Sequence, residues 1–412
     1  MRVAIFTLGC KTNQYEAELI RESFESYGDS VVPFSEKADL YIINSCVVTK
    51  KAEAETRKAI HHAKKVNAHS KVIVTSCFAK LYPHFKENNT YLYTGERTKI
   101  ADFYYKKLYY PVSLPEEIIK RFSGHTRATV KIEEGCDNFC SYCIIPFVRG
   151  NKIMSKPKEK VVKEVKSLVN AGYKEIVLTG TEIGKYGKDI NTSLALLLKE
   201  LKQIEGIERI RISSIYPLAV TDELIEEINA PVVPHLHMSL QSGDNELLKK
   251  MNRHYTIEEY EEIVKKLRKK DPNFSVTTDI IVGFPGETED AFLNSVLAVK
   301  KLHFSKVHIF RFSKRPFTPA YFIKETVPES LKKTRAKRLA YVSDIERLEF
   351  KKRFLNKTVK VLVEEKEENY YVGFTPYYLK AKFTCDAARQ GEIVNVVVKS
   401  ADANFLYGVC LK

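Results

Sequence analysis

Hydrophobic and polar positions alternate in blocks along the first hundred residues. Short apolar runs that predict strands are separated by longer stretches with helical spacing of apolar residues. In chain order these segments are 3–8, 13–27, 40–43, 50–66 and 72–74. The alternation of strand and helix is typical of a parallel sheet with helices packed on it. We therefore expect residues 1–105 to form an N-terminal α/β domain.

The same alternation returns after a softer stretch at 104–127, which contains Pro111 and Pro115 and which we interpret as a linker. Strands are predicted at 128–132, 175–179, 209–213, 235–240, 276–282 and 306–312. Helices are predicted at 158–171, 193–204, 222–228, 257–270 and 287–301. Six strand–helix units over residues 124–350 favour a partial TIM-like (β/α)6 barrel. A doubly wound open sheet is the alternative.

The pattern changes again near the C-terminus. A long basic helix is predicted at 329–354, and after it apolar residues recur with a period of two in five short segments. We expect residues 351–412 to form a small antiparallel β-barrel. The predicted fold class is therefore α/β, with this barrel at its end.

Composition and charge narrow the class of protein. Apolar residues make up 44% of the chain, and neither an apolar run of membrane-spanning length nor a signal-peptide pattern occurs. We expect a cytoplasmic protein with no membrane partner. Lys and Arg exceed Asp and Glu by 67 to 52, a net charge of +15, and residues 331–356 hold nine basic against three acidic groups. This concentration favours a nucleic-acid-binding face over a lysine-rich solvated surface.

Eight cysteines in such a chain argue against a disulfide framework. Cys10, Cys46 and Cys77 each follow one of the three predicted N-terminal strands closely. Because parallel strands end along one edge of a sheet, these thiols are expected to converge there as a metal or cluster site. Three buried structural cysteines are the alternative. We predict that Cys385 and Cys410 pack inside the terminal barrel.

The most specific motif is GCDNFCSYCIIP, at residues 135–146. Its C-x3-C-x2-C spacing places Cys136, Cys140 and Cys143 just after the first central strand, at the end where barrel active sites lie. Structural zinc would need a fourth ligand. Three thiolates suit a [4Fe–4S] cluster whose fourth iron stays open. Zinc or inert core thiols are the alternatives.

This motif, after the first strand of a partial barrel, resembles the radical S-adenosylmethionine (SAM) superfamily. The resemblance implies a [4Fe–4S] cluster that binds SAM at its open iron and cleaves it reductively to a 5′-deoxyadenosyl radical. It also implies an electron donor such as flavodoxin or ferredoxin. Tyr142, before the third cysteine, matches a position that is usually aromatic near the adenine.

The three upstream cysteines and the terminal barrel together resemble the methylthiotransferases of this superfamily, over essentially the whole chain. The resemblance implies a second, auxiliary [4Fe–4S] cluster on Cys10, Cys46 and Cys77. It also implies an RNA-binding TRAM domain at the C-terminus, and two SAM molecules per product. One SAM would methylate a cluster-bound sulfur, and the other would yield the radical.

Several segments are most similar to the MtaB type of this family: TLGCKTNQYEAE, EIVLTGTEIGKYG, HLHMSLQSGDNELLKKMNRHYT, DIIVGFPGETEDAF and FSKRPFTPA. That type implies methylthiolation of tRNA at C2 of N6-threonylcarbamoyladenosine, at position 37 beside the anticodon. The alternatives are isopentenyladenosine in tRNA, whose subgroup opens with GCQMN, and a ribosomal protein, whose subgroup opens with GCPKN. Here the opening is GCKTN, and Phe317 stands where a small residue is expected.

Further residues are candidates by position. Cofactor contacts are expected where central strands end, at Gly180, Thr181, Glu182, Ser214, Gln241, Ser242, Gly283 and Pro285. RNA contacts are expected from basic side chains of the long helix and the terminal barrel, at Arg335, Lys337, Arg338, Lys380 and Lys382. Ordinary turns and solvated faces are the competing interpretations. A non-catalytic RNA-binding iron–sulfur protein is the alternative from a different functional class.

Overall fold

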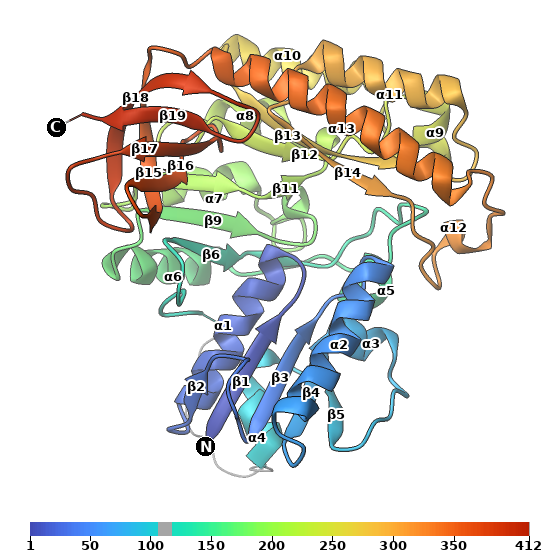
Figure 1. The fold of residues 1–412 in the computed structure, drawn as a ribbon, viewed down its shortest axis with the longest axis vertical. Helices are drawn as coiled ribbons and strands as arrows, with labels where there is room; N and C mark the ends of the chain where they lie inside the picture. The colour runs from blue at the N-terminus through green and yellow to red at the C-terminus, as the bar shows by residue number, and fades with distance from the viewer. Residues whose placement is uncertain (106–117, 412) are drawn as a thin grey trace.

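A computed structural model describes residues 1–105 and 118–411 (Figure 1). Half of the stretch that we interpret as a linker, residues 106–117, lies outside the described residues. The remaining chain forms three parts. A parallel sheet holds the N-terminus, a larger curved set of strands with outer helices follows, and a small barrel ends the chain.

The N-terminal sheet has five parallel strands in the order β2-β1-β3-β4-β5. The strands are β1 (Arg2–Thr7), β2 (Ser30–Val32), β3 (Leu40–Ser45), β4 (Lys71–Ser76) and β5 (Thr90–Tyr93). The helices are α1 (Lys11–Glu25), α2 (Lys50–Val66), α3 (Cys77–Leu81) and α4 (Ile100–Tyr105). The three predicted strands are confirmed. The edge strands β2 and β5 are short and mostly not fully buried, so they carry little hydrophobic signal.

The central part confirms all six predicted strand positions. They are β6 (Arg127–Lys131), β9 (Glu175–Thr179), β10 with β11 (Arg209–Ile212, Ser214–Ile215), β12 (His235–Met238), β13 (Ser275–Val282) and β14 (Lys306–Arg311). The third strand is interrupted at Ser213, so the strands fall into two parallel sheets, β10-β9-β6 and β11-β12-β13-β14. A bridge between Ile210 and Val232 joins the next segment to β10. This is the predicted partial barrel, with β6 and β14 at its two ends.

Helices cover the outside of this partial barrel. They are α6 (Lys158–Asn170), α7 (Leu194–Leu201), α8 (Asp222–Glu227), α9 (Asn245–Lys250), α10 (Ile257–Lys270) and α11 (Glu289–Leu302). Except for α6, each of these helices follows a residue whose side chain caps its first turn. In α10, for example, Thr256 and Glu259 form a reciprocal capping box that satisfies two backbone N–H groups. Leu197, Val264 and Val299 are among the apolar side chains that these helices bury in one core with the strands.

Shorter elements connect the parts. They are the hairpin strands β7 (Glu133–Glu134) and β8 (Met154–Ser155), the 3₁₀ turns η1 (Arg97–Lys99), η2 (Ile183–Lys185) and η3 (Pro217–Ala219), and the helices α5 (Ile145–Arg149) and α12 (Pro319–Phe322). No helix among residues 1–105 and 118–411 is long and apolar enough to cross a membrane.

The C-terminal part begins with α13 (Glu329–Lys352), which packs on β14 and α11. Five strands then close into a barrel in the order β15-β16-β17-β19-β18. They are β15 (Thr358–Glu367), β16 (Tyr370–Phe374), β17 (Lys380–Thr384), β18 (Ile393–Ala401) and β19 (Leu406–Cys410). The barrel is confirmed, although β17 and β19 pair in parallel. Cys385 and Cys410 pack against the apolar core of this barrel, as predicted, and a disulfide joins them.

Buried arginines of β10 attach this barrel to the central strands. Arg209 donates hydrogen bonds to the carbonyls of Phe374 and Lys360, at 2.9 and 3.1 Å. Arg211 donates to the carbonyls of Pro376 and Thr375, at 3.1 and 3.3 Å. At the other side, the strands of the N-terminal sheet run with their carboxyl ends toward the central part (Figure 1).

Candidate functional site

The N-terminal sheet gathers three cysteines at the carboxyl ends of adjacent strands. Cys10 precedes α1 after β1, Cys46 follows β3, and Cys77 begins α3 after β4. Gly9 has a φ of +99°, and a Cβ there would lie 2.9 Å from the Cys46 Sγ atom. Only glycine lets the first cysteine segment approach the second this closely. The predicted convergence of these thiols is therefore built into the sheet.

All three N-terminal thiols are free. Burial, followed by the neighbouring Cys77 and Cys10, raises the pKa of Cys46 to about 11. Burial also raises the pKa of Cys77. Thiols of this kind stay protonated at neutral pH without a cation, and a bound metal reverses that preference. The donor set thus fits an iron–sulfur cluster.

The second triad lies in the loop between β7 and α5. A Cβ on Gly135 would lie 1.9 Å from the Lys152 carbonyl oxygen, so the loop can turn here only at a glycine. Burial raises the pKa of Cys136 and of Cys143 to about 12. Arg253 is buried and donates a hydrogen bond to the Cys140 Sγ atom at 3.3 Å. The positive charge of this guanidinium offsets the negative charge of a thiolate at Cys140.

Within residues 1–105 and 118–411, no three Cys, His, Asp or Glu side chains converge closely enough to share one metal ion. A [4Fe–4S] cluster does not require this, because each thiolate binds a different iron.

The cysteine loop and the segment that follows Cys46 line a common cavity. A cavity of about 180 Å³ is lined by Val48 and Thr49, shortly after Cys46, and by Tyr142 and Cys143 of the loop. On the adjacent surface, Cys77 shares one apolar cluster with Ile144 and Val148 of the segment that follows the loop. The N-terminal sheet edge and the cysteine loop therefore form one site.

Arg149, at the end of α5, ties these two segments together. Its guanidinium is buried, pairs with Glu16 of α1, and donates to the Ser76 hydroxyl at 3.0 Å and to the Asn13 side chain. Although burial raises the pKa of Glu16, Arg149 and the neighbouring cations hold it far below its usual value. The pair is thus ionised, and each partner compensates the other.

Glu133 and Gly180 meet where the first two central strands end. A Cβ on Gly180 would lie 2.5 Å from Glu133 Oε2, and that oxygen accepts the Glu182 N–H at 2.8 Å. Glu133 Oε1 is buried without a hydrogen-bond partner in the described structure, and burial raises the pKa of this carboxyl to about 8. Without a partner this buried carboxyl stays largely protonated at neutral pH, and a cationic group beside it would favour the carboxylate.

The other two predicted residues of the 180–182 segment also make contacts near Glu133 and the cysteine loop. Glu182 accepts hydrogen bonds from the Asn138 side chain at 3.0 Å and from the Tyr216 N–H at 3.3 Å. Thr181 lies between Gly180 and Glu182. Its backbone N–H lowers the pKa of Glu133, but burial outweighs this effect and raises that pKa overall. These contacts position the cysteine loop through Asn138.

The predicted cofactor contacts at the ends of the next strands lie in different surroundings. Gln241 lines the 180 Å³ cavity, and its φ of +70° turns the chain there. Ser214 lines a separate cavity of about 270 Å³. Ser242 is fully buried, and its hydroxyl contacts Ser295 of α11 at 3.4 Å and accepts the Asp244 N–H. That side chain serves helix packing, so the structure does not support it as a cofactor contact.

Gly283 and Pro285 lie in the turn after β13. A Cβ on Gly283 would meet the Lys332 side chain of α13 at 2.3 Å, and the Gly283 N–H donates to Glu287 at 2.7 Å. Pro285 is buried. This turn packs against α13, which explains the glycine without a ligand. Its Phe284 nevertheless shares an apolar cluster with Tyr142.

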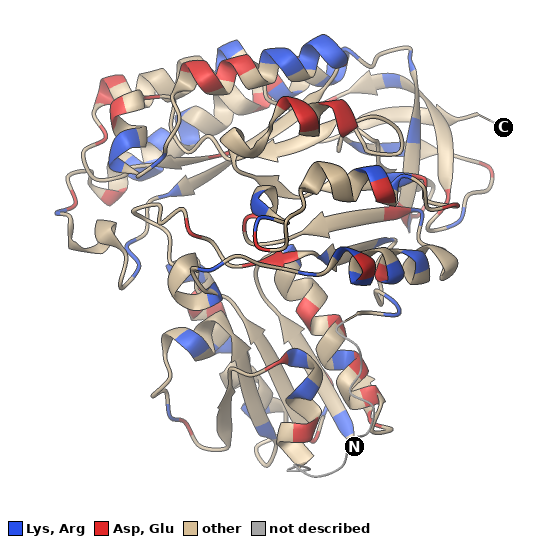
Figure 2. Cartoon of the chain, turned by 180° about the vertical axis from the view of Figure 1, so that it is seen from behind, with Lys and Arg blue, Asp and Glu red and all other residues tan. Residues whose placement is uncertain are grey.

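The residues predicted to contact RNA also differ in their exposure and in their partners. Arg335 is buried and pairs with Glu287 at 2.7 Å, so the expectation of a phosphate contact at this residue is wrong. Lys337 is exposed, and Arg338 is half exposed beside Glu289. Lys380 and Lys382 pair with Glu365 and Glu367 on the barrel surface. Basic and acidic residues are interspersed along the helices seen in Figure 2.

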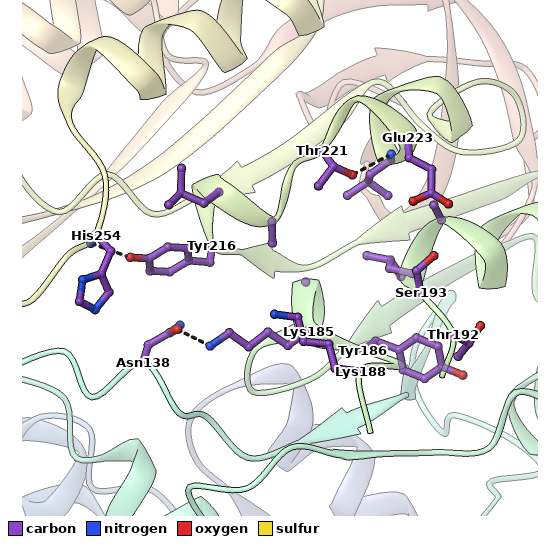
Figure 3. Close-up of a pocket in the computed structure, with 16 residues that line it drawn as sticks. Asn138, Lys185, Tyr186, Lys188, Thr192, Ser193, Tyr216, Thr221, Glu223 and His254 are labelled. Atoms are coloured by element: carbon purple, nitrogen blue, oxygen red, sulfur yellow. Dashed lines mark hydrogen bonds between the residues drawn. The ribbon is translucent and has the colours of Figure 1, made fainter. Parts of the chain in front are cut away.

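A larger cavity of about 410 Å³ opens beside the cysteine loop at Asn138 (Figure 3). Lys185 extends across it to Asn138, and the Tyr216 hydroxyl accepts the His254 N–H on the opposite wall. No cysteine lines it. The 180 Å³ cavity contains Cys143, so we place the chemistry there despite its smaller volume.

Sequence reasoning missed Glu133, Arg149 and Arg253. Each adjoins a quoted motif: Glu133 precedes the first glycine of the cysteine loop, Arg149 follows it, and Arg253 lies in MNRHYT. For Glu133 and Arg149, a charged residue within three positions of the cysteine motif is the signal that was available; Arg253 had no such signal.

Comparison with protein families and known proteins follows the same division of the chain. Residues 130–299 match the Radical SAM superfamily, and residues 2–92 match a family described as Uncharacterized protein family UPF0004. Among solved structures, the radical SAM methyltransferase TsrM from Kitasatospora setae has a TM-score of 0.57 at 15% identity, covering 77% of this chain and 76% of its own. That likeness concerns the fold alone.

Curated relatives extend over nearly the whole chain. The "Threonylcarbamoyladenosine tRNA methylthiotransferase MtaB" of Thermotoga maritima is 43% identical over 97% of this chain and 94% of its own length. The protein of the same name from Bacillus subtilis is 39% identical, with the same coverage. A "tRNA-2-methylthio-N(6)-dimethylallyladenosine synthase" of Clostridium tetani is 35% identical over 96% of this chain and 93% of its own. The chain therefore belongs to the radical SAM methylthiotransferase family, among relatives of the MtaB type.

Proposed function

We propose that this protein transfers a methylthio group to C2 of N6-threonylcarbamoyladenosine at position 37 of tRNA, beside the anticodon. The observation that carries this proposal is the cavity shared by Cys143 of the loop and the segment after Cys46 of the N-terminal sheet. A radical generated at one triad and a sulfur held at the other would meet there. An aromatic C–H is not acidic enough for an ordinary side-chain base, so radical chemistry suits this carbon.

Each cysteine triad has a separate role in this proposal. Cys136, Cys140 and Cys143 would hold the SAM-binding [4Fe–4S] cluster, and Cys10, Cys46 and Cys77 the auxiliary one. When bound, these groups supply reductive SAM cleavage and the sulfur that is transferred. The protein's part is to hold the thiolates, compensate their charge through Arg253 and Arg149, and keep the two segments in register.

The residues around the cysteine loop fit SAM. The unpartnered, buried oxygen of Glu133 would accept from the methionine ammonium, and it lies beside Gly180, where a side chain would collide. Tyr142 and Gln241 line the adjoining cavity with Cys143, where the adenosine would bind. Burial of Glu133 raises the benefit of a cationic partner, because an unpaired buried acceptor is costly.

The macromolecular partners follow from charge and exposure. Lys337, Arg338, Lys380 and Lys382 remain the basic side chains proposed to contact tRNA phosphates. An electron donor such as flavodoxin or ferredoxin would reduce the cluster, and the cytoplasm is the compartment where tRNA and such donors meet.

Iron counting after anaerobic reconstitution tests the two-cluster arrangement. The wild type is expected to hold about eight irons, and the Cys10→Ala/Cys46→Ala/Cys77→Ala variant about four. Cys385→Ser/Cys410→Ser is the matched control, because it removes the two remaining cysteines without touching either triad, and it should retain about eight. Four irons in both the wild type and the triple variant would contradict the auxiliary cluster.

Product analysis tests the reaction. With reductant and SAM, the wild type should form the methylthio product on tRNA carrying N6-threonylcarbamoyladenosine, and none on tRNA carrying isopentenyladenosine. The triple variant should still release 5′-deoxyadenosine without methylthio product. Product formation on the isopentenylated tRNA instead would assign the chain to the other tRNA modification.

A further inference from the structure

A second cavity lies inside the central barrel, with a volume of about 270 Å³. All three parts of the chain line it: Lys11 from the N-terminal sheet, Ser214, His235 and Asp279 from the central strands, and Tyr378 from the terminal barrel. Small-molecule sites usually measure about 300–1,000 Å³, so this space suits a substituent rather than a whole nucleoside.

The position of this cavity relates it to the reaction. Asp279 and Phe310 line it and also line the 180 Å³ cavity that contains Tyr142 and Cys143. The two spaces therefore adjoin through these side chains. A base placed with its reacting carbon near the cysteine loop can extend a substituent into the second cavity.

A chain of hydrogen bonds fixes the polar character of one wall. Asp279 Oδ2 lies 3.0 Å from His237 Nε2, Thr277 Oγ1 lies 2.9 Å from His237 Nδ1, and the same hydroxyl lies 3.1 Å from His235 Nε2. Although burial raises the pKa of Asp279, hydrogen bonding to His237 holds it below its usual value. The carboxylate thus accepts from His237 Nε2–H.

The donors and acceptors in this chain can then be assigned in sequence. His237 Nδ1 accepts the Thr277 O–H, and the Thr277 oxygen accepts His235 Nε2–H. This leaves His235 Nδ1 as a bare acceptor. The His235 side chain is buried, and its Nδ1 atom has no partner among residues 1–105 and 118–411. His235 thus contributes a buried, unsatisfied acceptor to this wall, and a ligand donor brought beside it would satisfy it.

Lys11, the residue after Cys10, places a positive charge at the wall of this cavity. Its Nζ atom lies 5.7 Å from the centre of the Tyr378 ring. No hydrogen bond or ion pair of Lys11 occurs within the described parts of the chain. Around it, Arg211 and Arg127 are already directed to Glu175. An ammonium without a carboxylate, at the wall of a cavity, suits an anionic ligand.

We propose that this cavity binds the threonylcarbamoyl group of the modified adenosine, with Lys11 holding its carboxylate and His235 Nδ1 accepting from its hydroxyl or urea N–H. This inference rests on the proposed function and adds the substrate subsite. An isopentenyl group offers neither an anion nor a donor, so it would leave both protein groups unsatisfied. Lys11 is thus assigned as a specificity-determining residue.

The experiment pairs two substrates with three proteins. The substrates are anticodon stem-loop RNAs carrying either N6-threonylcarbamoyladenosine or the methyl ester of its carboxyl group. The proteins are the wild type, Lys11→Met, and the control Lys65→Met, which removes an exposed charge at the far end of α2. Methylthio product in single turnover and RNA affinity are measured for each pair. Iron content and 5′-deoxyadenosine release establish that Lys11→Met retains both clusters.

The wild type should prefer the acid over the ester by roughly 10- to 100-fold, the range for a charge-assisted contact. Lys11→Met should lose turnover on the acid alone, and it should therefore lose the preference. Lys65→Met should keep the preference, and Lys11→Arg should restore part of it. Equal loss on both RNAs, unchanged activity of Lys11→Met, or a wild type indifferent to esterification would overturn the subsite. If no product forms but the wild type still binds the acid more tightly than the ester, the proposed reaction is contradicted and the subsite is not.

Discussion

At the scale of single residues, Arg149 shows how much this site depends on one buried side chain. It contacts Glu16, Asn13 and Ser76 of the N-terminal sheet from a helix that begins two residues after Cys143. A buried ion pair is weak support for stability as a whole, yet removing one partner leaves an uncompensated charge. The contact between the two cysteine segments therefore depends on both partners being present.

We predict that Arg149→Met lowers the free energy of unfolding by about 3–5 kcal/mol, because Glu16 then stays buried without its main partner. Denaturant unfolding measures this loss. Adding Glu16→Gln to Arg149→Met should recover part of it. Arg2→Met is the matched control, since it removes the arginine of an exposed pair with Glu36 and should cost less than about 1 kcal/mol. Similar losses in both arginine variants would contradict the prediction.

The sequence predicted the cysteines because their signal is local: a thiol at the end of a strand, or a fixed spacing in a loop. Glu133 and Arg253 matter through contacts with Gly180 and Cys140, which are distant in sequence. Arg335 looked like a phosphate contact because composition counts charge without showing which face is covered.

At the scale of elements, α13 divides its basic residues between two tasks. Arg335 pairs with Glu287 under the helix, whereas Lys337 faces solvent. The helix is therefore in part a structural clamp over the turn after β13, and only its outer face is available to RNA.

This division predicts opposite effects of two substitutions on one helix. Lys337→Met should weaken tRNA binding and reduce the dependence of log affinity on log salt by about one, as expected for a lost phosphate contact. Arg335→Met should instead lower thermal stability, because Glu287 loses its buried partner. Affinity titrations at several salt concentrations and thermal unfolding separate the two. An unchanged salt slope for Lys337→Met would remove that residue from the RNA face.

The junction between β10 and the terminal barrel predicts a pH effect. Although burial raises the pKa of Glu175, Arg211 and the neighbouring arginines hold it at about 2. A lowered carboxyl pKa stabilises the fold above the unfolded value of about 4.5, and this contribution disappears as pH falls toward 2. It amounts to about 3 kcal/mol.

Unfolding free energies measured between pH 6 and about pH 3 should therefore fall more steeply in the wild type than in Glu175→Gln. The exposed Glu205→Gln is the control and should follow the wild type. Cluster loss in acid affects all three proteins, so the difference between them is the quantity that tests the junction. Parallel curves for the wild type and Glu175→Gln would contradict it.

At the scale of the whole molecule, periodicity predicted the order of the parts, and the structure confirmed it. It could not predict that the third central strand breaks at Ser213, or that β17 and β19 pair in parallel, because both follow from closure and docking rather than from local pattern. Periodicity likewise could not show that the segment after Cys46 and the cysteine loop line one cavity.

The cavity between Lys11 and Tyr378 has a consequence for synthesis on the ribosome. Lys11 emerges well before Tyr378, and the wall they share also needs strands made in between. A nascent chain can thus acquire its cysteine-bearing segments long before the compartment that receives the nucleotide is complete. If this cavity selects the substrate as proposed, selection requires strands from all three parts, whereas both cysteine triads lie in the first 143 residues of the given sequence.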